Sequence, residues 1–476
     1  MRSGLVKFGA LLLACGLAAC ASYQPGRLEP AQSARHFAQR SLSNPHLCRY
    51  LQSNISGRSN GALCPPSGWD LTSLTLAGFF YSPDLAVAQA NLAVVKAGII
   101  TAGQRPNPSL GLGPQYSASL APAFTPWAIG AAELNFPIET AGKRSYRLAQ
   151  ARALAEGAAL GVGEAAWNVR QAVRSALMTE LVSQRQLELA QAYQAASARI
   201  ALLIQQRAAA GEIAAPAVDF ALTNLATSRL KTTQAQTRIP AARNQLAAAI
   251  GVPAQALRGL SLAWPDFDHP PDPSALDEAR VRRLALQNSL ELRRLLTQYA
   301  AADDALKLEI ARQYPDINLG GGYSWEGNEN IFELLPVITL PVMNQNQGPI
   351  AQARARRAQA ASVFIAAQAH VIAQANAALS NYRGALEVLE QATRAVTFAQ
   401  QRLAGMRRAV ELGDTDKLTL AAAELDTLQV RQSELSALSG AQSALGALED
   451  AMQRPLEPGA LGSFTLPRHE ETEQRL

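Results

Sequence analysis

Two periods of hydrophobic positions alternate along this chain, and each occurs twice. Apolar residues alternate with polar or small ones over about 109–119 and 127–138, and again over about 315–326 and 331–341. Alternation with a period of two residues is typical of β-strands with one apolar face. Each pair of strands precedes a long stretch with helical periodicity that ends at a glycine, Gly211 or Gly413. The pattern predicts a duplicated unit of two short strands and a very long helix.

Recurring motifs support the duplication. Pro-Ser-Leu-Gly-Leu-Gly at 108–113 recurs as Pro-Asp-Ile-Asn-Leu-Gly at 315–320, and Ala-Gln-Ala-Arg at 149–152 recurs at 351–354. A repeat of about 200 residues is a duplicated half-domain rather than a solenoid unit. We therefore expect a signal peptide at 1–19, an N-terminal leader at 20–80, a first repeat at 81–251, a connector at 252–273, a second repeat at 274–452 and a flexible polar tail at 453–476.

Helical periodicity predicts the other elements of each repeat. Helices are expected at about 83–104 and 274–313 before the strands, at about 143–210 and 348–412 after them, and at about 216–251 and 415–452 beyond the glycines. The first long helix contains no proline and would be about 100 Å long at 1.5 Å per residue. Apolar and small residues recur in it with heptad spacing, which favours close, supercoiled helix packing.

The N-terminus has the pattern of an export signal. Arg2 and Lys7 accompany a short apolar run, and small residues precede Cys20. The run is too short to span a bilayer as a helix. The segment resembles a bacterial lipoprotein signal, in which the residue matching Cys20 is lipidated, for example with palmitate. Ala21 in place of aspartate then implies outer-membrane sorting, and residues 20–80 would form a lipid-anchored leader with little periodicity over 21–70. The alternative is a plain signal peptide with a chance cysteine.

Two other cysteines, Cys48 and Cys64, remain after export. An exported pair is a disulfide candidate, because the compartment is oxidising. Two thiols with His46 nearby are too few ligands for a convincing metal site.

Composition excludes several classes of protein. Alanine and leucine supply much of the 48% hydrophobic content and aromatic residues only 6%, which indicates a helical protein. The net charge of +5 is scattered along the helices, so we expect solvated helix faces and no nucleic-acid partner. The five histidines are dispersed, and no catalytic or cofactor-binding motif is present. We therefore expect no enzyme activity, no cofactor and no resident metal. The Gly320–Gly322 run lies within a strand pattern and indicates a barrel bend or close packing rather than a phosphate loop.

Strands of about ten residues with one apolar face have the length needed to cross a bilayer in a barrel. Tyr323 and Trp325, near a strand end, suit an aromatic girdle; the alternative is a small soluble sheet. A sheet in lipid must close, and four strands are too few to close alone. Three chains would form a 12-stranded barrel with a water-filled lumen. The expected fold is mainly α with a small transmembrane β part, in which the trimeric barrel continues into a periplasmic α-helical barrel.

Several motifs resemble those of the TolC-type outer-membrane efflux channel family over about residues 80–452. They are Arg-Pro-Asn-Pro at 105–108, Gly-Lys-Arg at 142–144, Ala-Gly-Glu-Ile at 210–213, Leu-Pro at 340–341 and Asn-Gln-Gly at 346–348. The Gly-Lys-Arg and Asn-Gln-Gly motifs resemble the CzcC/CusC branch, which serves heavy-metal efflux.

This resemblance implies the outer-membrane channel of a tripartite, RND-type efflux system that passively exports heavy-metal cations or related toxic compounds. The implied partners are two further copies in a homotrimer, a periplasmic adaptor (membrane fusion) protein, an inner-membrane RND transporter and outer-membrane lipids. Alternatives are a channel for drugs or other organic compounds, a type I secretion outlet, or a periplasmic coiled-coil scaffold lipoprotein without a pore.

The sequence departs from the family at the expected periplasmic constriction. The family has an aspartate pair after the second glycine break, whereas the matching positions here are Thr419 and Ala422. Four other acidic residues lie near the two breaks and are candidates for a periplasmic gate or an adaptor contact: Glu212, Asp219, Asp414 and Asp416. The alternative is ordinary capping and dipole pairing at helix N-termini.

Overall fold

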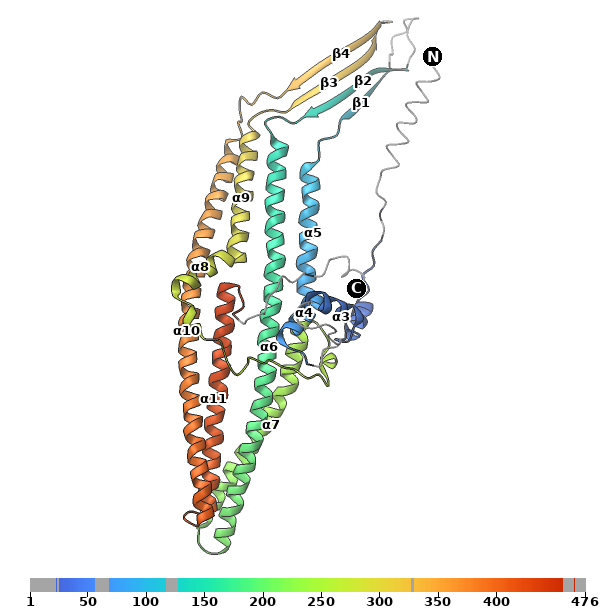
Figure 1. The fold of residues 1–476 in the computed structure, drawn as a ribbon. Helices are drawn as coiled ribbons and strands as arrows, with labels where there is room; N and C mark the ends of the chain where they lie inside the picture. The colour runs from blue at the N-terminus through green and yellow to red at the C-terminus, as the bar shows by residue number, and fades with distance from the viewer. Residues whose placement is uncertain are drawn as a thin grey trace.

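The computed structural model describes residues 23, 25–55, 68–116, 127–326, 329–456 and 466. The molecule is elongated, with a β-sheet at one end and long helices along the axis (Figure 1). At the other end lie the loops that connect α6 to α7 and α10 to α11. The helices are α2 (Pro30–Ala38), α3 (Pro45–Asn54), α4 (Leu71–Tyr81), α5 (Pro83–Gly103), α6 (Lys143–Ala209), α7 (Ala215–Ile250), α8 (Glu278–Asn288), α9 (Leu290–Ala311), α10 (Gln347–Leu412) and α11 (Lys417–Met452). The strands are β1 (Ser109–Tyr116), β2 (Trp127–Ile138), β3 (Ile317–Glu326) and β4 (Glu329–Ile338).

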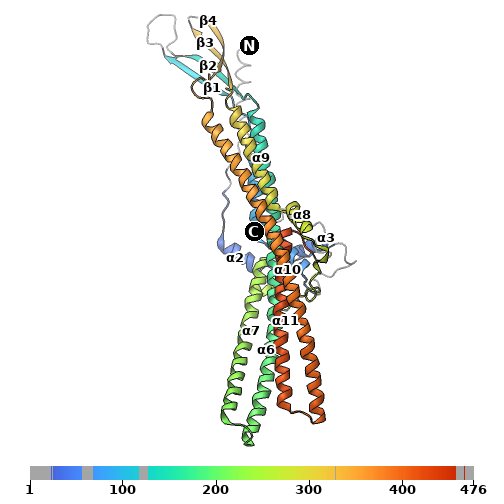
Figure 2. The same ribbon diagram turned by 90° about the vertical axis from the view of Figure 1, so that its left-hand side faces the viewer.

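The expected duplication is present in the order of elements. The series α5-β1-β2-α6-α7 recurs as α9-β3-β4-α10-α11. The long helices α6 and α10 have 67 and 66 residues, and α7 and α11 have 36 residues each. In Figure 2 the α6/α7 and α10/α11 hairpins lie next to each other and turn at the same end. We call residues 210–214 the first tip and residues 413–416 the second tip.

The single helix expected over 274–313 is wrong, because two helices occupy that stretch. Ser289 separates α8 from α9 with backbone angles outside the helical region (φ −54°, ψ 109°). Its hydroxyl accepts a hydrogen bond from the Leu292 backbone N–H at 3.1 Å and so caps α9. The N-cap geometry therefore overrides a helical pattern that continues through this position.

The four strands form one antiparallel sheet in the order β1-β2-β3-β4. Pairing of β2 with β3, with Leu134 opposite Gly321, joins the two repeats. Close packing is confirmed at Gly320, where a Cβ would lie 2.9 Å from the Leu335 carbonyl oxygen, but not at Gly321 or Gly322.

The main hydrophobic core lies near the middle of the molecule, where α4 packs against α6 and α7. Helix α4 is apolar on all sides and nearly all of its residues are buried. Asp70 and Ser73 form a capping box at its start. The irregular leader expected over 21–70 is wrong in its secondary structure, because α2 and α3 lie within it and α4 follows directly.

A buried polar cluster links α6 to α11 at this level. Arg170 Nη1 lies 3.0 Å from Glu449 Oε2, and Arg174 Nη1 donates to the Gln442 carbonyl oxygen at 2.8 Å. Glu449 and Gln442 have no exposed surface. Gly446 leaves room for this crossing, since a Cβ there would lie 2.5 Å from Arg174 Nη1. We call this the central clamp.

Candidate functional site

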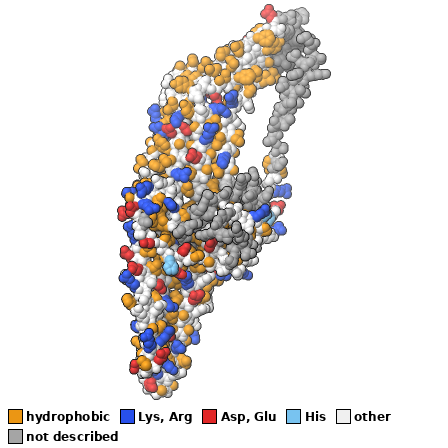
Figure 3. All heavy atoms as spheres, in the orientation of Figure 1, with side chains coloured by type: hydrophobic (Ala, Val, Ile, Leu, Met, Phe, Trp, Pro, Cys, Tyr) orange, Lys and Arg blue, Asp and Glu red, His pale blue; other side chains and the backbone are white. Residues whose placement is uncertain are grey.

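The sheet has two chemically different faces. The register places the following residues on one face: Leu110, Leu112, Leu134, Phe136, Ile138, Ile317, Leu319, Tyr323, Phe332, Leu334 and Ile338. Many of these side chains are exposed, for example Phe332 at 80% and Leu334 at 73%. In Figure 3 hydrophobic side chains dominate the described part of the sheet, whereas charged side chains are spread over the helices. A folded chain with such a surface requires an apolar environment or a partner to cover it.

The opposite face carries polar side chains and glycines together with three apolar residues of β4, Ile331, Leu335 and Val337. Glu133 and Glu333 both lie opposite Gly322 in the strand register, so they flank one glycine at the same level of the sheet. Asn135 and Asn318 lie on the same face. An apolar face and a more polar face on one sheet match the lipid side and the water side of a membrane barrel.

The sheet is open along both sides. Strand β1 pairs with β2 alone and β4 with β3 alone within the described chain. Unpaired edges are ready to accept another strand. In lipid they would leave backbone groups without hydrogen bonds, so closure by further copies is required there.

The junction between strands and long helices explains the Gly-Lys-Arg and Asn-Gln-Gly motifs. Gly142 and Asn346 occupy the same position in the two repeats, directly before α6 and α10, and both have a left-handed backbone (φ 72° and 62°). Glycine and asparagine are the residues that tolerate this conformation best. Lys143 Nζ then lies 2.7 Å from both Asp316 Oδ1 and the Tyr314 carbonyl oxygen, which fastens the first repeat to the second.

An ion pair between Arg207, in the last turn of α6, and Asp416, in the second tip, joins the two hairpins. Arg207 Nη2 lies 2.7 Å from Asp416 Oδ2, and Oδ1 accepts a hydrogen bond from the Thr419 backbone N–H at 2.7 Å. Asp416 is thus the N-cap of α11, the role that the capping alternative predicts. The Thr419 N–H and the Arg207 guanidinium lower the pKa of the Asp416 carboxyl to about 2.

The other three acidic candidates have no comparable contact within the described residues. Glu212 is exposed in the first tip and lines a surface pocket together with Arg207 and Asp416. Asp414 is exposed in the second tip, where its backbone N–H donates to the Ala409 carbonyl oxygen at 2.9 Å. Asp219 is exposed on α7. A gating or adaptor role for all four stays a prediction, and the structure brings Asp416 and Glu212 together.

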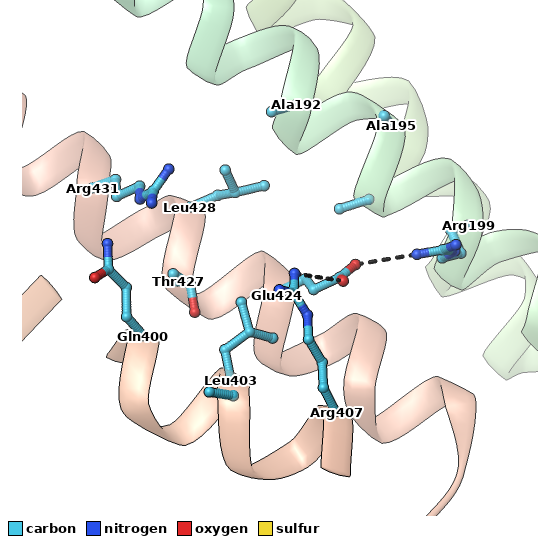
Figure 4. A pocket seen from close by; sticks show the side chains of 12 residues that line it. Ala192, Ala195, Arg199, Gln400, Leu403, Arg407, Glu424, Thr427, Leu428 and Arg431 are labelled. Atoms are coloured by element: carbon cyan, nitrogen blue, oxygen red, sulfur yellow. Dashed lines mark hydrogen bonds and ion pairs between the residues drawn. The ribbon is translucent and has the colours of Figure 1, made fainter. Parts of the chain in front are cut away.

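Above the tips, a second ionic contact crosses between the hairpins (Figure 4). Glu424 on α11 lies 3.3 Å from Arg199 on α6 and 3.5 Å from Arg407 on α10. We call the boundary between the hairpins, formed by α6, α10 and α11, the seam. Sequence reasoning missed Arg199, Arg207 and Glu424. Only Arg207 had a local signal, as a basic residue in the last turn of α6.

The remaining predicted sites lie partly outside the described residues. Cys48 is disulfide-bonded, and Cys64 lies outside the described part, so the pairing of the two stays a prediction. Cys20 and the side chain of Trp325 also lie outside it. Within the described ranges, no group of three or more His, Cys, Asp or Glu side chains could hold a metal ion.

Comparison with known proteins agrees with this architecture. Residues 81–252 match the outer membrane efflux protein family. The chain is 27% identical over 289 residues to the cobalt-zinc-cadmium resistance protein CzcC of Cupriavidus metallidurans. That match covers 60% of this chain and 65% of CzcC, slightly less than two thirds of the relative's length.

Two solved structures share the fold. The outer membrane protein VceC of Vibrio cholerae has a TM-score of 0.66 at 18% identity, over 81% of this chain and 97% of VceC. The structure of CusC, described with its transmembrane channel formation, has a TM-score of 0.64 at 16% identity, over 91% of this chain and 99% of CusC. The resemblance to TolC-type outer-membrane efflux channels, in the CzcC/CusC branch, is confirmed, and so is the mainly helical fold class with a small sheet.

Proposed function

We propose that this chain is the outer-membrane channel of a tripartite, RND-type efflux system and forms a homotrimer. The observation that carries the proposal is the sheet, which is open at both edges, apolar on one face and more polar on the other. Three copies bring β1 of one chain next to β4 of the next and close a 12-stranded barrel around a polar lumen. The hairpins then extend the lumen into the periplasm.

Helix α5 supports the trimer as well. It is apolar enough to cross a membrane by length and composition, yet almost none of it is buried within the chain. Val87, Val94 and Ile100 are at least 60% exposed. Because α5 leads directly into the edge strand β1 (Figure 1), a neighbouring copy that pairs with this edge also covers the exposed side of α5.

We assign the cargo to heavy-metal cations, with a periplasmic adaptor and an inner-membrane pump as partners. The similarity to a cobalt-zinc-cadmium resistance protein supports this cargo. The tips are the surfaces that an adaptor reaches first, since they end the hairpins away from the sheet (Figure 1). The channel itself is passive and performs no enzymatic reaction. Lipidation at Cys20 anchors the leader to the outer membrane.

Single-channel recording tests the pore. The purified protein is checked for a trimer by native mass and is then added to planar lipid bilayers. Discrete conductance steps from a trimer are expected. A lipid-anchored monomer without conductance would overturn the proposal and favour the periplasmic scaffold.

A matched variant separates the channel from the scaffold independently of conductance. Cys20→Ser removes the lipid site and leaves the sheet intact. A barrel protein still requires detergent after this change, because the apolar face of its sheet remains. A scaffold becomes water-soluble.

Growth assays test the cargo. A strain that lacks this chain is challenged with cobalt, zinc and cadmium salts and, in parallel, with a panel of organic antimicrobials. Sensitivity to the metals alone supports metal export. Sensitivity to the organic compounds alone would transfer the proposal to the drug-efflux alternative.

A further inference from the structure

The seam contains a cavity of about 540 Å³ between the two hairpins. Helix α6 contributes Ala192, Ala195, Ala196 and Arg199; α10 contributes Gln400, Leu403, Ala404 and Arg407; and α11 contributes Glu424, Thr427, Leu428 and Arg431. Each helix therefore presents positions i, i+3, i+4 and i+7, which is one face of a helix. Since alanines supply much of this lining, the three helices leave a hollow where larger side chains would meet.

The cavity has an apolar middle and charged ends. In Figure 4, Arg431 and Gln400 lie at one end, and Arg199, Glu424 and Arg407 lie at the other. Three guanidinium groups and one carboxylate give the lining a net charge of +2. Glu424 is already shared between Arg199 and Arg407. Arg431 forms no hydrogen bond or ion pair within the described residues, so its charge is available to a ligand.

The shape of the cavity favours a small ligand over a helix of another protein. The Arg199–Glu424 contact crosses from α6 to α11 at one end of the cavity (Figure 4) and marks its limit along the seam. Arg431 and Glu424 are seven residues apart on α11, which corresponds to about 10 Å along its axis. A volume of this size and a largely apolar lining with a few convergent polar groups are typical of small-molecule sites.

We propose that this cavity binds an amphiphilic organic anion. Its carboxylate or sulfonate pairs with Arg431, and its apolar body, about 10 Å long, packs against the alanines and leucines of the three helices. The ligand touches α6 in one hairpin and α10 and α11 in the other, so its binding joins the hairpins across the seam. The site lies in the seam of one chain, and a ligand there goes beyond the proposed channel function.

Binding of 2-naphthalenesulfonate tests the site. The full-length protein in lipid nanodiscs is titrated by isothermal calorimetry, and the signal of empty nanodiscs is subtracted. Saturable binding is expected. Arg431→Gln should weaken it about tenfold or more, because a charge-assisted hydrogen bond is lost. Arg229→Gln is the matched control, since Arg229 is an exposed arginine on α7 outside the cavity.

Two further ligands and one further variant separate the contributions. Inorganic sulfate should bind at least tenfold more weakly than the naphthalenesulfonate, because sulfate lacks an apolar body. Naphthylmethylammonium should also bind at least tenfold more weakly than the naphthalenesulfonate, because it has the opposite charge. Ala196→Leu, which fills the cavity from a buried position, should abolish binding without a change in charge. If Ala196→Leu does not fold, the Arg431→Gln variant still tests the proposal, because Arg431 is exposed and its substitution leaves the core unchanged.

The proposal is overturned if Arg431→Gln binds as tightly as the unaltered protein. It is also overturned if sulfate matches the naphthalenesulfonate, which would indicate an adventitious ion only, or if the ammonium compound does, which would indicate apolar adsorption.

Discussion

Arg207 and Asp416 join the two helical hairpins although they are 209 residues apart in the sequence, with Nη2 2.7 Å from Oδ2. Asp416 at the same time accepts the Thr419 backbone N–H as the N-cap of α11. One carboxylate therefore both starts a helix and holds that helix against the neighbouring hairpin. The two roles can be separated by substitution.

Asp416→Ala removes the cap and the ion pair, whereas Asp416→Asn keeps a cap acceptor and removes only the charge. We expect the alanine variant to destabilise the start of α11 by about 1 kcal/mol and the asparagine variant by a few tenths at most. Hydrogen exchange of the 417–421 amides measures this difference. Asp414→Ala serves as the control, because only the backbone N–H of Asp414 makes a contact. Equal exchange in the Asn and Ala variants would show that Asp416 does not cap the helix.

The contribution of Asp416 should depend on pH only in strong acid. Its pKa is lowered from 3.8 to about 2 in the folded protein. A lowered carboxyl pKa means that the stabilisation is fully present above about 3.8 and is lost as the pH falls towards about 2. We expect exchange at the start of α11 to be insensitive to Asp416 ionisation between pH 7 and 5. The acid-dependent increase should be absent in Asp416→Asn, and a transition near pH 6 that this substitution abolishes would contradict the assignment.

Glu449 in the central clamp should contribute far more to the stability of the fold than an exposed glutamate does. Glu449→Gln leaves the buried Arg170 and Arg174 without a carboxylate, and removal of one partner from a buried ion pair costs about 3–5 kcal/mol. We expect a clear fall in the thermal unfolding midpoint. Glu390→Gln breaks an exposed pair with Arg394 on α10 and should change stability by about 0.5 kcal/mol or less. Similar midpoints for the two variants would mean that the clamp does not stabilise the fold.

Substitution by alanine at two glycines of α11 should change the stability of the protein in opposite directions. A Cβ on Gly440 meets no atom within 4 Å, so Gly440→Ala should stabilise the helix by up to about 1 kcal/mol. A Cβ on Gly446 would lie 2.5 Å from Arg174 Nη1, and this guanidinium is held by Gln442. Gly446→Ala should therefore destabilise the protein by about 1–3 kcal/mol despite the better helix propensity. The thermal unfolding midpoints of the two variants are compared. A higher midpoint in both variants would rule out the close contact between a Cβ at position 446 and Arg174.

The long helices, the strands and the duplication were predictable because each depends on a local period of hydrophobic residues. Helix α4 was missed for the same reason, since a helix that is apolar on all sides has no amphipathic period to detect. The break at Ser289 was missed because the helical pattern continues across it, and only the capping geometry ends α8 there.

Local sequence patterns were enough to predict the strands and the helices α5, α6, α7, α10 and α11 with their approximate ends, because backbone preferences act between near neighbours. The Gly-Lys-Arg and Asn-Gln-Gly motifs were recognised separately, and the structure shows that Gly142 and Asn346 share a left-handed backbone at equivalent positions. The packed fold was needed to show that Asp416 meets Arg207, that Glu424 meets Arg199 and that Gly446, unlike Gly440, faces an arginine. These relationships depend on the register in which distant helices pack, and that register is set by contacts across the whole chain.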